Sequence, residues 1–282
     1  MARKAKYVVI DAETYRTRDE AVIRGLEQEA MAKRPNTNTR KELKLTWDTE
    51  AEIMRRVEEA LAKTSTDVLL AEILCVCVKA DEDACVIQLS GMGKFCQTEC
   101  LKNTAFSLSD ITGPDTIWIG HNIAGFDLPL LLNRFRRHGV TPPEHFPVFT
   151  GRRWMGRVFD TMLRTPCQNS LGYVSLEDVC RAYGLPSAKS TMWNGAPMDG
   201  SRVGEAYEAG EYDLILEYCA ADVWIEEQLY QRMTFDGRWG TYDLRTAVAE
   251  QIAEIDASGL DDTAMRVAKF NVLEAAGLVP RH

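Results

Sequence analysis

Four carboxylates and a tyrosine, spread over three separated segments, are the residues of this chain whose types and spacing could do chemistry together. Asp11 and Glu13 stand two apart where an apolar run ends, so an extended backbone would point both side chains to the same face. Asp127 closes the string His-Asn-Ile-Ala-Gly-Phe-Asp. Tyr218 and Asp222 are four apart in a helical pattern, which places them on one helix face.

Clustered carboxylates repel one another and cost several kcal/mol when buried unpaired, so such a cluster requires a cation. Hard oxygen ligands suit Mg²⁺ or Mn²⁺, and two such ions about 3.5–4 Å apart suit phosphoryl transfer. Each pattern alone is weak, because D-x-E also occurs at Asp48–Glu50 and Y-x-x-x-D at Tyr7–Asp11 and Tyr15–Asp19. The ordered set of three segments is what predicts a site for two Mg²⁺ or Mn²⁺ ions.

The elements that must position these residues alternate between strands and helices. Apolar, β-branched runs predict strands at 7–10, 73–78, 84–89, 116–119 and 157–160, the second and third forming a hairpin. Helical spacing and caps predict helices at about 48–63, 127–135, 176 to before 184, and 213–233. The result is a mixed β-sheet flanked by helices, with a partly helical insertion at 16–66 and a helical extension after 233.

Composition limits the class of protein. The 282 residues carry 33 Lys+Arg against 42 Asp+Glu, a net charge of −9, which argues weakly against a nucleic-acid partner. No apolar run approaches the roughly 20 residues that span a bilayer, and the apolar stretch near the N-terminus is too short for a signal peptide, so we expect a cytoplasmic protein. None of the eight cysteines forms a C-x-x-C pair, which favours reduced, buried thiols over zinc sites or disulfides.

Two stretches are basic against this acidic average. Between Arg134 and Arg164 the chain holds seven arginines and two acids, and Arg152 and Arg153 lie beside Trp154 in a predicted loop. Basic groups next to an aromatic ring suit contact with single-stranded nucleic acid. A second basic loop covers 33–44. A solvated surface is the alternative for both stretches, and the sequence leaves the choice open.

The three segments, taken in order, resemble the motifs of the DnaQ-like, or DEDD, superfamily of 3′–5′ exonucleases. Residues 11–14 match the first motif, 120–127 the second and 218–222 the third. The third motif resembles the branch that carries a tyrosine, since Glu217 stands where the other branch has histidine. The stretches 159–161, 175–179, 184–186 and 198–203 are similar to stand-alone, often phage-encoded exonucleases related to the proofreading domain of family-B DNA polymerases. The resemblance covers about 5–15 and 68–233.

This resemblance implies a ribonuclease H-like α/β fold for an exonuclease domain at 1–233. It does not account for the insertion at 16–66 or for the helical extension at 234–282, which is predicted from the residues alone. It implies two-metal hydrolysis of DNA, at single-stranded 3′ ends, to nucleoside 5′-monophosphates in a bacterial or phage-infected cytoplasm. By resemblance, Asp11 would bridge both ions, Glu13 and Asp222 would hold the ion carrying the attacking water, and Asp127 would anchor the second. Tyr218 would orient that water.

Further side chains near the motifs are candidate substrate contacts. These are Thr14, His121, Asn122, Phe126 and Asp160, together with Arg152 and Arg153. Structural alternatives stay open, because His121 and Asn122 could tie a loop together, Phe126 could pack in the core, and Asp160 could cap a turn. The alternative functions are an exoribonuclease, a catalytically silent nucleic-acid-binding module, and a nucleotide phosphohydrolase with the same metal site.

Overall fold

The computed structural model describes residues 4–32, 50–80, 86–93, 96–147, 157–165, 173–187 and 190–234. Contacts divide the chain into two compact units, Met1–Leu229 and Tyr230–His282. The first unit holds every element named below except the last residues of helix α10, which crosses the boundary. The predicted C-terminal extension and the basic loop at 33–44 lie outside the described residues.

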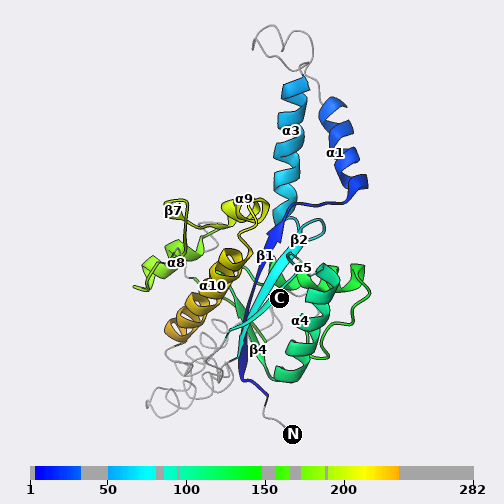
Figure 1. Ribbon diagram of the computed structural model, residues 1–282. Coiled ribbons are helices and arrows are strands. Elements are labelled where there is room, and N and C mark those ends of the chain that lie inside the picture. The colour runs from blue at the N-terminus through cyan, green and yellow to red at the C-terminus, as the bar shows by residue number, and fades with distance from the viewer. Residues whose placement is uncertain are drawn as a thin grey trace, which may run out of the picture. The chain divides into compact units, whose positions relative to one another are not determined.

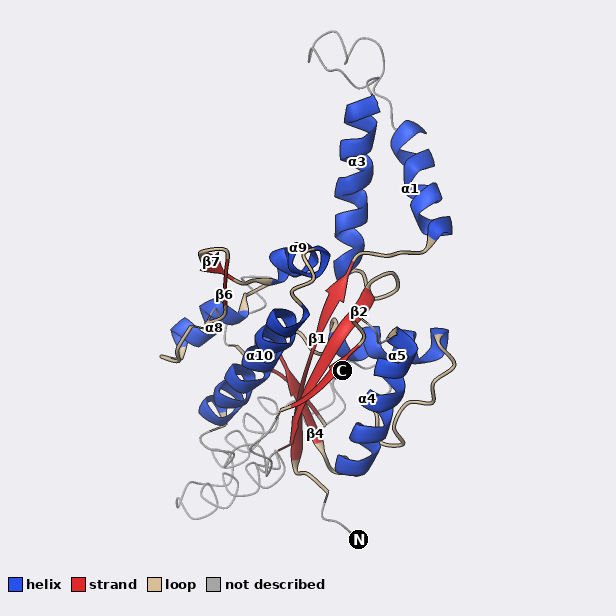
Figure 2. Ribbon diagram, viewed as in Figure 1, coloured by secondary structure: helices blue, strands red, loops and turns tan. Residues whose placement is uncertain are grey.

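The first unit is built on a five-stranded mixed sheet in the order β3-β2-β1-β4-β5. Figure 2 labels its strands β2, β1 and β4. β2 is antiparallel to both β1 and β3, whereas β1, β4 and β5 run parallel. This is the mixed sheet that the sequence predicts, in the ribonuclease H-like arrangement that the resemblance implies. The strands are β1 (Tyr7–Tyr15), β2 (Glu72–Ala80), β3 (Ile87–Ser90), β4 (Ile117–Gly120) and β5 (Val158–Asp160).

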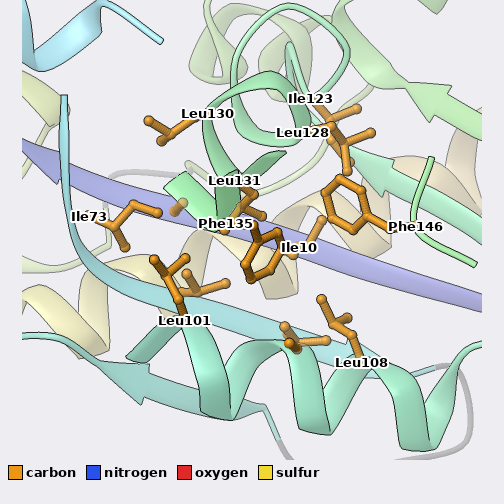
Figure 3. Packing of buried hydrophobic residues seen from close by; sticks show 14 of the residues in the cluster. Ile10, Ile73, Leu101, Leu108, Ile123, Leu128, Leu130, Leu131, Phe135 and Phe146 are labelled. Carbon is orange, nitrogen blue, oxygen red and sulfur yellow. The ribbon is translucent and has the colours of Figure 1, made fainter. Parts of the chain in front are cut away.

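One face of the sheet packs against helices α4 (Gln97–Ile111) and α5 (Asp127–Arg137). Alternation along β1 turns Val8, Ile10 and Ala12 to this face, where they join the main apolar cluster. Figure 3 shows Leu101 and Phe135 entering that cluster from the two helices. Burial of these side chains fixes the central strand between the two helices.

The opposite face of β1 carries Asp11 and Glu13, which pair across the ladder with Cys77 and Cys75 of β2. Helix α10 (Tyr212–Met233) lies on the other side of the sheet from α4 (Figure 1), and its Cys219 thiol contacts the Asp11 backbone carbonyl at 3.5 Å. The acidic residues of the central strand therefore lie between the sheet and α10.

The sequence prediction differs from the structure in several details, among them the absence of a predicted helix at 20–32. β1 continues to Tyr15, so the two acidic residues lie inside the paired strand and not beyond its end. β3 begins at Ile87, three residues later than predicted. Helix α4 was missed altogether, although its buried residues repeat at helical spacing: Cys100, Leu101, Thr104, Ala105 and Leu108. The polar residues between them weaken the apolar pattern.

The predicted insertion after β1 contains two helices, α1 (Glu20–Ala32) and α3 (Glu50–Lys63), and ends in the short helix η1 (Thr64–Thr66). The two helices pack through a small apolar cluster that includes Ala30 and Val57. Beyond β5 lie shorter elements: α6 (Thr161–Arg164), α8 (Leu176–Ala182), β6 (Met192–Trp193), β7 (Ala196–Pro197), η2 (Gly200–Arg202) and α9 (Val203–Glu208).

The thiols behave as the sequence predicts in the part of the chain that the structure describes. Six free cysteines are found there, and all but Cys96 are buried. None of the helices described is long and apolar enough to cross a membrane. The location of the protein in the cell stays a prediction.

A buried ion pair joins β2 to α10. The Lys79 Nζ lies 2.6 Å from the Glu227 Oε1, which also accepts a hydrogen bond from the Tyr7 hydroxyl at 2.9 Å. We expect Lys79→Met to lower the free energy of unfolding by about 3–5 kcal/mol, because it leaves a buried carboxylate without its counter-charge. Denaturant titration measures the loss. The double variant Lys79→Met/Glu227→Leu should recover most of it, and an equal loss in both variants would contradict the explanation.

Candidate metal centre

Three carboxylates converge between the central strand and α10. Ligand oxygens of Asp11, Glu13 and Asp222 all lie within 4.8 Å of one another. Spacing of two residues on a strand brings the first two together, and antiparallel pairing with β2 holds that strand rigid. The register shifts between Glu13 and Thr14, and such irregularities re-aim side chains next to functional sites.

Asp127 adds a fourth carboxylate from α5. Its side chain is buried and accepts a hydrogen bond from the Ala12 backbone N–H. The charge of Asp11 raises the pKa of this carboxyl group. Its Oδ1 has no hydrogen-bond partner among the described residues. The structure thus brings all four predicted carboxylates to one centre, although Asp127 lies outside the compact group of three.

The turn between β4 and α5 delivers Asp127 to this centre. A Cβ on Gly120 would lie 2.9 Å from the Ile123 Cβ, so the tight start of the turn favours glycine. Asn122 has a positive φ of 61°. The Asp160 carboxylate accepts hydrogen bonds from the backbone N–H groups of Asn122 and Ala124, both at 3.1 Å, and so fixes the turn against β5.

The electrostatics of the centre fit a divalent cation. Burial raises the pKa of Asp11 to about 6. Burial and the charges of neighbouring carboxylates raise the pKa values of Glu13 and Asp127 well above their usual range, and burial and the charge of Asp11 do the same for Asp222. The Asp11 Oδ2 and the Asp127 Oδ1 are buried without hydrogen-bond partners among the described residues. An oxygen-only set of mutually repelling ligands suits Mg²⁺ or Mn²⁺.

Tyr218 lies one helical turn before Asp222 and shares its face of α10. The phenol hydrogen-bonds to the Asp222 carboxylate. Burial, then the charges of Glu13, Asp222 and Asp11, raise the pKa of Tyr218. The hydroxyl therefore stays protonated near neutral pH, so it acts as a hydrogen-bond donor and not as a base.

Sequence reasoning missed a fifth acidic residue. Glu226 is 2% exposed and lies four residues after Asp222, and its Oε1 accepts a hydrogen bond from the His121 backbone N–H at 2.9 Å. Burial and then the charges of Asp11, Asp127 and Asp222 raise its pKa. The repeat at 218, 222 and 226 on one helix face is the sequence pattern that could have found it.

Five of the candidate substrate contacts lie in the part of the chain that the structure describes. Both ring nitrogens of His121 are engaged, Nδ1 with the Thr161 hydroxyl at 3.0 Å and Nε2 with the Val174 carbonyl at 2.8 Å. Asp160 is 1% exposed and caps α6 besides fixing the turn. Phe126 packs against the main apolar cluster, and the Thr14 hydroxyl donates to the Ser65 carbonyl at 2.7 Å. The fifth, Asn122, forms the turn itself.

Arg152 and Arg153 lie outside the described residues. Two other arginines of the basic stretch bind other parts of the protein. Arg134 is 1% exposed and donates to the Leu69 carbonyl, so the alternative of a solvated surface is wrong at this position. Arg137 pairs with Asp19 at 2.7 Å.

A groove of about 920 Å³ opens at the end of β1 between the insertion and α9. Thr14 and Arg16 line it, and Arg16 pairs with Glu58 and with Glu208, the latter at 3.1 Å. Four glutamates and two basic residues border the groove: Glu58, Glu59, Glu205, Glu208, Arg16 and Lys63. This acidic balance does not favour a nucleic-acid backbone along the insertion.

Fold and site together define a protein with a ribonuclease H-like sheet and an acidic centre between β1, α5 and α10. Residues 66–258 match the family described as predicted 3′–5′ exonucleases related to the exonuclease domain of PolB, and the chain belongs to this family. No curated protein and no solved structure matches the chain. The family carries hydrolase activity and a nucleic-acid substrate as its expected properties.

The matched region includes Asp127, Tyr218 and Asp222 but not β1, which carries Asp11 and Glu13. Pairing of β1 with β2 and β4 ties that strand into the matched region. Asp11 and Glu13 therefore lie outside the matched sequence but belong to the same sheet as the matched strands.

Proposed function

We propose that the protein is a metal-dependent 3′–5′ exonuclease that removes nucleoside 5′-monophosphates from single-stranded ends of DNA. The observation that carries this proposal is the convergence of Asp11, Glu13 and Asp222 within 4.8 Å, with Asp127 beside them. Family membership supports the exonuclease activity, and the relation to PolB favours DNA over RNA. The tyrosine at position 218 supports the tyrosine branch of the resemblance.

Asp11, Glu13 and Asp222 would hold one divalent ion, and Asp11 and Asp127 a second. Two such ions supply a hydroxide-like nucleophile near neutral pH and neutralise the charge that grows on the phosphate. The protein's own contribution is positioning, because the ligands come from a paired strand and two packed helices. We propose Mg²⁺ or Mn²⁺, the ions that oxygen ligands favour.

Among the candidate substrate contacts, the geometry favours some over others. Thr14 stays a proposed contact by resemblance alone, because its hydroxyl donates to the Ser65 carbonyl and the groove that it lines is acidic. The engaged ring of His121 and the buried carboxylate of Asp160 favour roles in holding the turn. Tyr173, 71% exposed and adjacent to the Val174 carbonyl that binds His121, offers a ring on which a base could stack. Arg152 and Arg153 stay proposed contacts to the strand.

We also propose that residues 1–233 form the exonuclease domain and 234–282 an extension to it, in a cytoplasmic protein. The family match covers residues 66–258 and so runs past 233, which means that it supports an exonuclease region but not this boundary.

The function is tested by digesting oligonucleotides labelled at the 3′ or the 5′ end, DNA beside RNA, with Mn²⁺ or with EDTA. The proposal requires immediate release of labelled mononucleotide from the 3′-labelled DNA and a ladder of shortened products from the 5′-labelled DNA, both stopped by EDTA. Products from internal cleavage, or faster digestion of RNA, would contradict it.

We expect Tyr218→Phe to lower the rate of mononucleotide release by about 10–100-fold, the loss typical of removing a supporting hydrogen bond at a metal site. The substitution removes one hydroxyl from the face of α10 that carries Asp222 and leaves all carboxylates in place. Single-turnover digestion measures the rate, and calorimetry should show unchanged Mn²⁺ binding. A full rate in Tyr218→Phe would remove the tyrosine from the mechanism.

A further inference from the structure

Glu226 is a buried carboxylate that the four-ligand site does not use. It comes from α10, one turn after Asp222 and two turns after Tyr218, so all three share a face of the helix. With 2% exposure it is as inaccessible as the apolar residues around it. A buried glutamate is costly unless its charge is compensated, so its presence here needs a physical reason.

The two oxygens of Glu226 differ. Oε1 accepts a hydrogen bond from the His121 backbone N–H at 2.9 Å and so supports the turn that leads to Asp127. Oε2 is buried and has no hydrogen-bond partner among the described residues. Positioning of the turn therefore accounts for one oxygen only.

The unpartnered oxygen belongs to a set of three. The Asp11 Oδ2 from β1, the Asp127 Oδ1 from α5 and the Glu226 Oε2 from α10 are all buried without hydrogen-bond partners in the described part of the chain. The charges of Asp11 and Asp127 both act on Glu226. Three elements thus each contribute one buried carboxylate oxygen that has no hydrogen-bond partner among the described residues, and Glu226 is close enough to Asp11 and Asp127 for their charges to raise its pKa.

We propose that Glu226 is a fifth acidic residue of the metal centre, which accepts a hydrogen bond from water on the ion held by Asp11 and Asp127. It acts through water because it lies outside the compact group of Asp11, Glu13 and Asp222. Mg²⁺ usually keeps several of its waters, so a carboxylate can stabilise the ion without direct contact. This inference rests on the proposed function, since it assigns a residue to the same centre.

The test is Mn²⁺ binding to the full chain, measured by calorimetry, for the wild type, Glu226→Gln and Glu226→Ala. Glutamine keeps an oxygen for the His121 N–H but loses the charge. We expect Glu226→Gln to weaken binding of the weaker ion about 10–100-fold, as loss of an outer partner of a metal site does. In EDTA its thermal midpoint should rise, because one buried acid is gone. The control is Glu217→Gln, an exposed glutamate on the same helix, which should change neither quantity.

Unchanged Mn²⁺ binding in Glu226→Gln would overturn the inference. If only Glu226→Ala weakened binding, Glu226 would be a positioning residue for the turn, and the inference would also be wrong. A wild-type chain that binds no Mn²⁺ would instead refute the proposed function itself, so the two failures are distinguishable.

Discussion

Replacing Asp11 with asparagine is expected to abolish metal-dependent release of mononucleotides, with a loss well beyond the roughly 100-fold that follows from disturbing a partner outside the ligand shell. Asp11 is the carboxylate that the rest of the centre shares. Its negative charge raises the pKa values of Glu13, Asp127 and Asp222, and also those of Tyr218 and Glu226. On the proposed mechanism, removing that charge would weaken both ion positions at once.

The activity loss must be separated from a folding defect. Asparagine has nearly the shape of aspartate, and losing a repelling charge should leave the stability of Asp11→Asn in EDTA equal to or above that of the wild type. Single-turnover digestion and thermal denaturation of the same preparation measure the two effects. Asp110→Asn, an exposed position at the end of α4, is the matched control and should keep full activity. Full activity in Asp11→Asn would refute the metal-centre mechanism.

Removing metal should make stability fall as pH rises. Burial raises the pKa of Asp11 from 3.8 to about 6, so the folded state holds its proton more tightly than the unfolded chain. The stability this contributes is fully present below pH 3.8 and is lost as pH rises through about 6. Asp11 alone accounts for a decrease of about 1 kcal/mol between pH 5 and 7.5. Glu13, Asp127 and Asp222 shift in the same direction and add to it.

Metal should reverse this trend, because ions bind the deprotonated carboxylates. Mn²⁺ at about 100 times its dissociation constant is expected to raise the free energy of unfolding by about 2.7 kcal/mol per bound ion. We expect this stabilisation to be larger at pH 7.5 than at pH 5. Denaturant titrations at both pH values, in EDTA and in Mn²⁺, measure the four stabilities. In EDTA, the free energy of unfolding should depend less steeply on pH in Asp11→Asn than in the wild type. The difference between the two slopes is the contribution of the Asp11 carboxylate. Equal stabilities in EDTA and in Mn²⁺ at pH 7.5 would contradict the metal centre.

Local sequence patterns were sufficient to predict most of the strands and helices that position the site. Apolar runs predicted the strands around β1 and β4, and the helical period with its caps predicted α5 and α10 to within a few residues. The Ser175 hydroxyl accepts a hydrogen bond from the Asp178 N–H at 3.1 Å, which confirms the predicted cap of α8. Helix α4 escaped prediction because its buried face mixes cysteine, threonine and alanine with leucine, so hydrophobicity alone does not mark it.

The net charge of −9 first argued against a nucleic-acid partner, yet the chain belongs to a family of predicted exonucleases. An average over the surface does not describe a local centre, and part of the acidic excess is gathered at one place between β1 and α10. Arg134 illustrates the same limit from the other side, since a basic residue counted with the surface is 1% exposed.

The sequence by itself determined the types, order and local spacing of the acidic residues, because a period of two on a strand and of four on a helix depends only on the backbone. It could not decide how close β1, α5 and α10 lie, since contacts between segments some 100 residues apart depend on the packing of the whole sheet. Only the tertiary structure joined β1 to the matched region and brought its carboxylates to Asp222. The spacing of Glu226 on α10 was readable from the sequence, but only the tertiary structure showed that its carboxylate is buried with one unpartnered oxygen among the described residues.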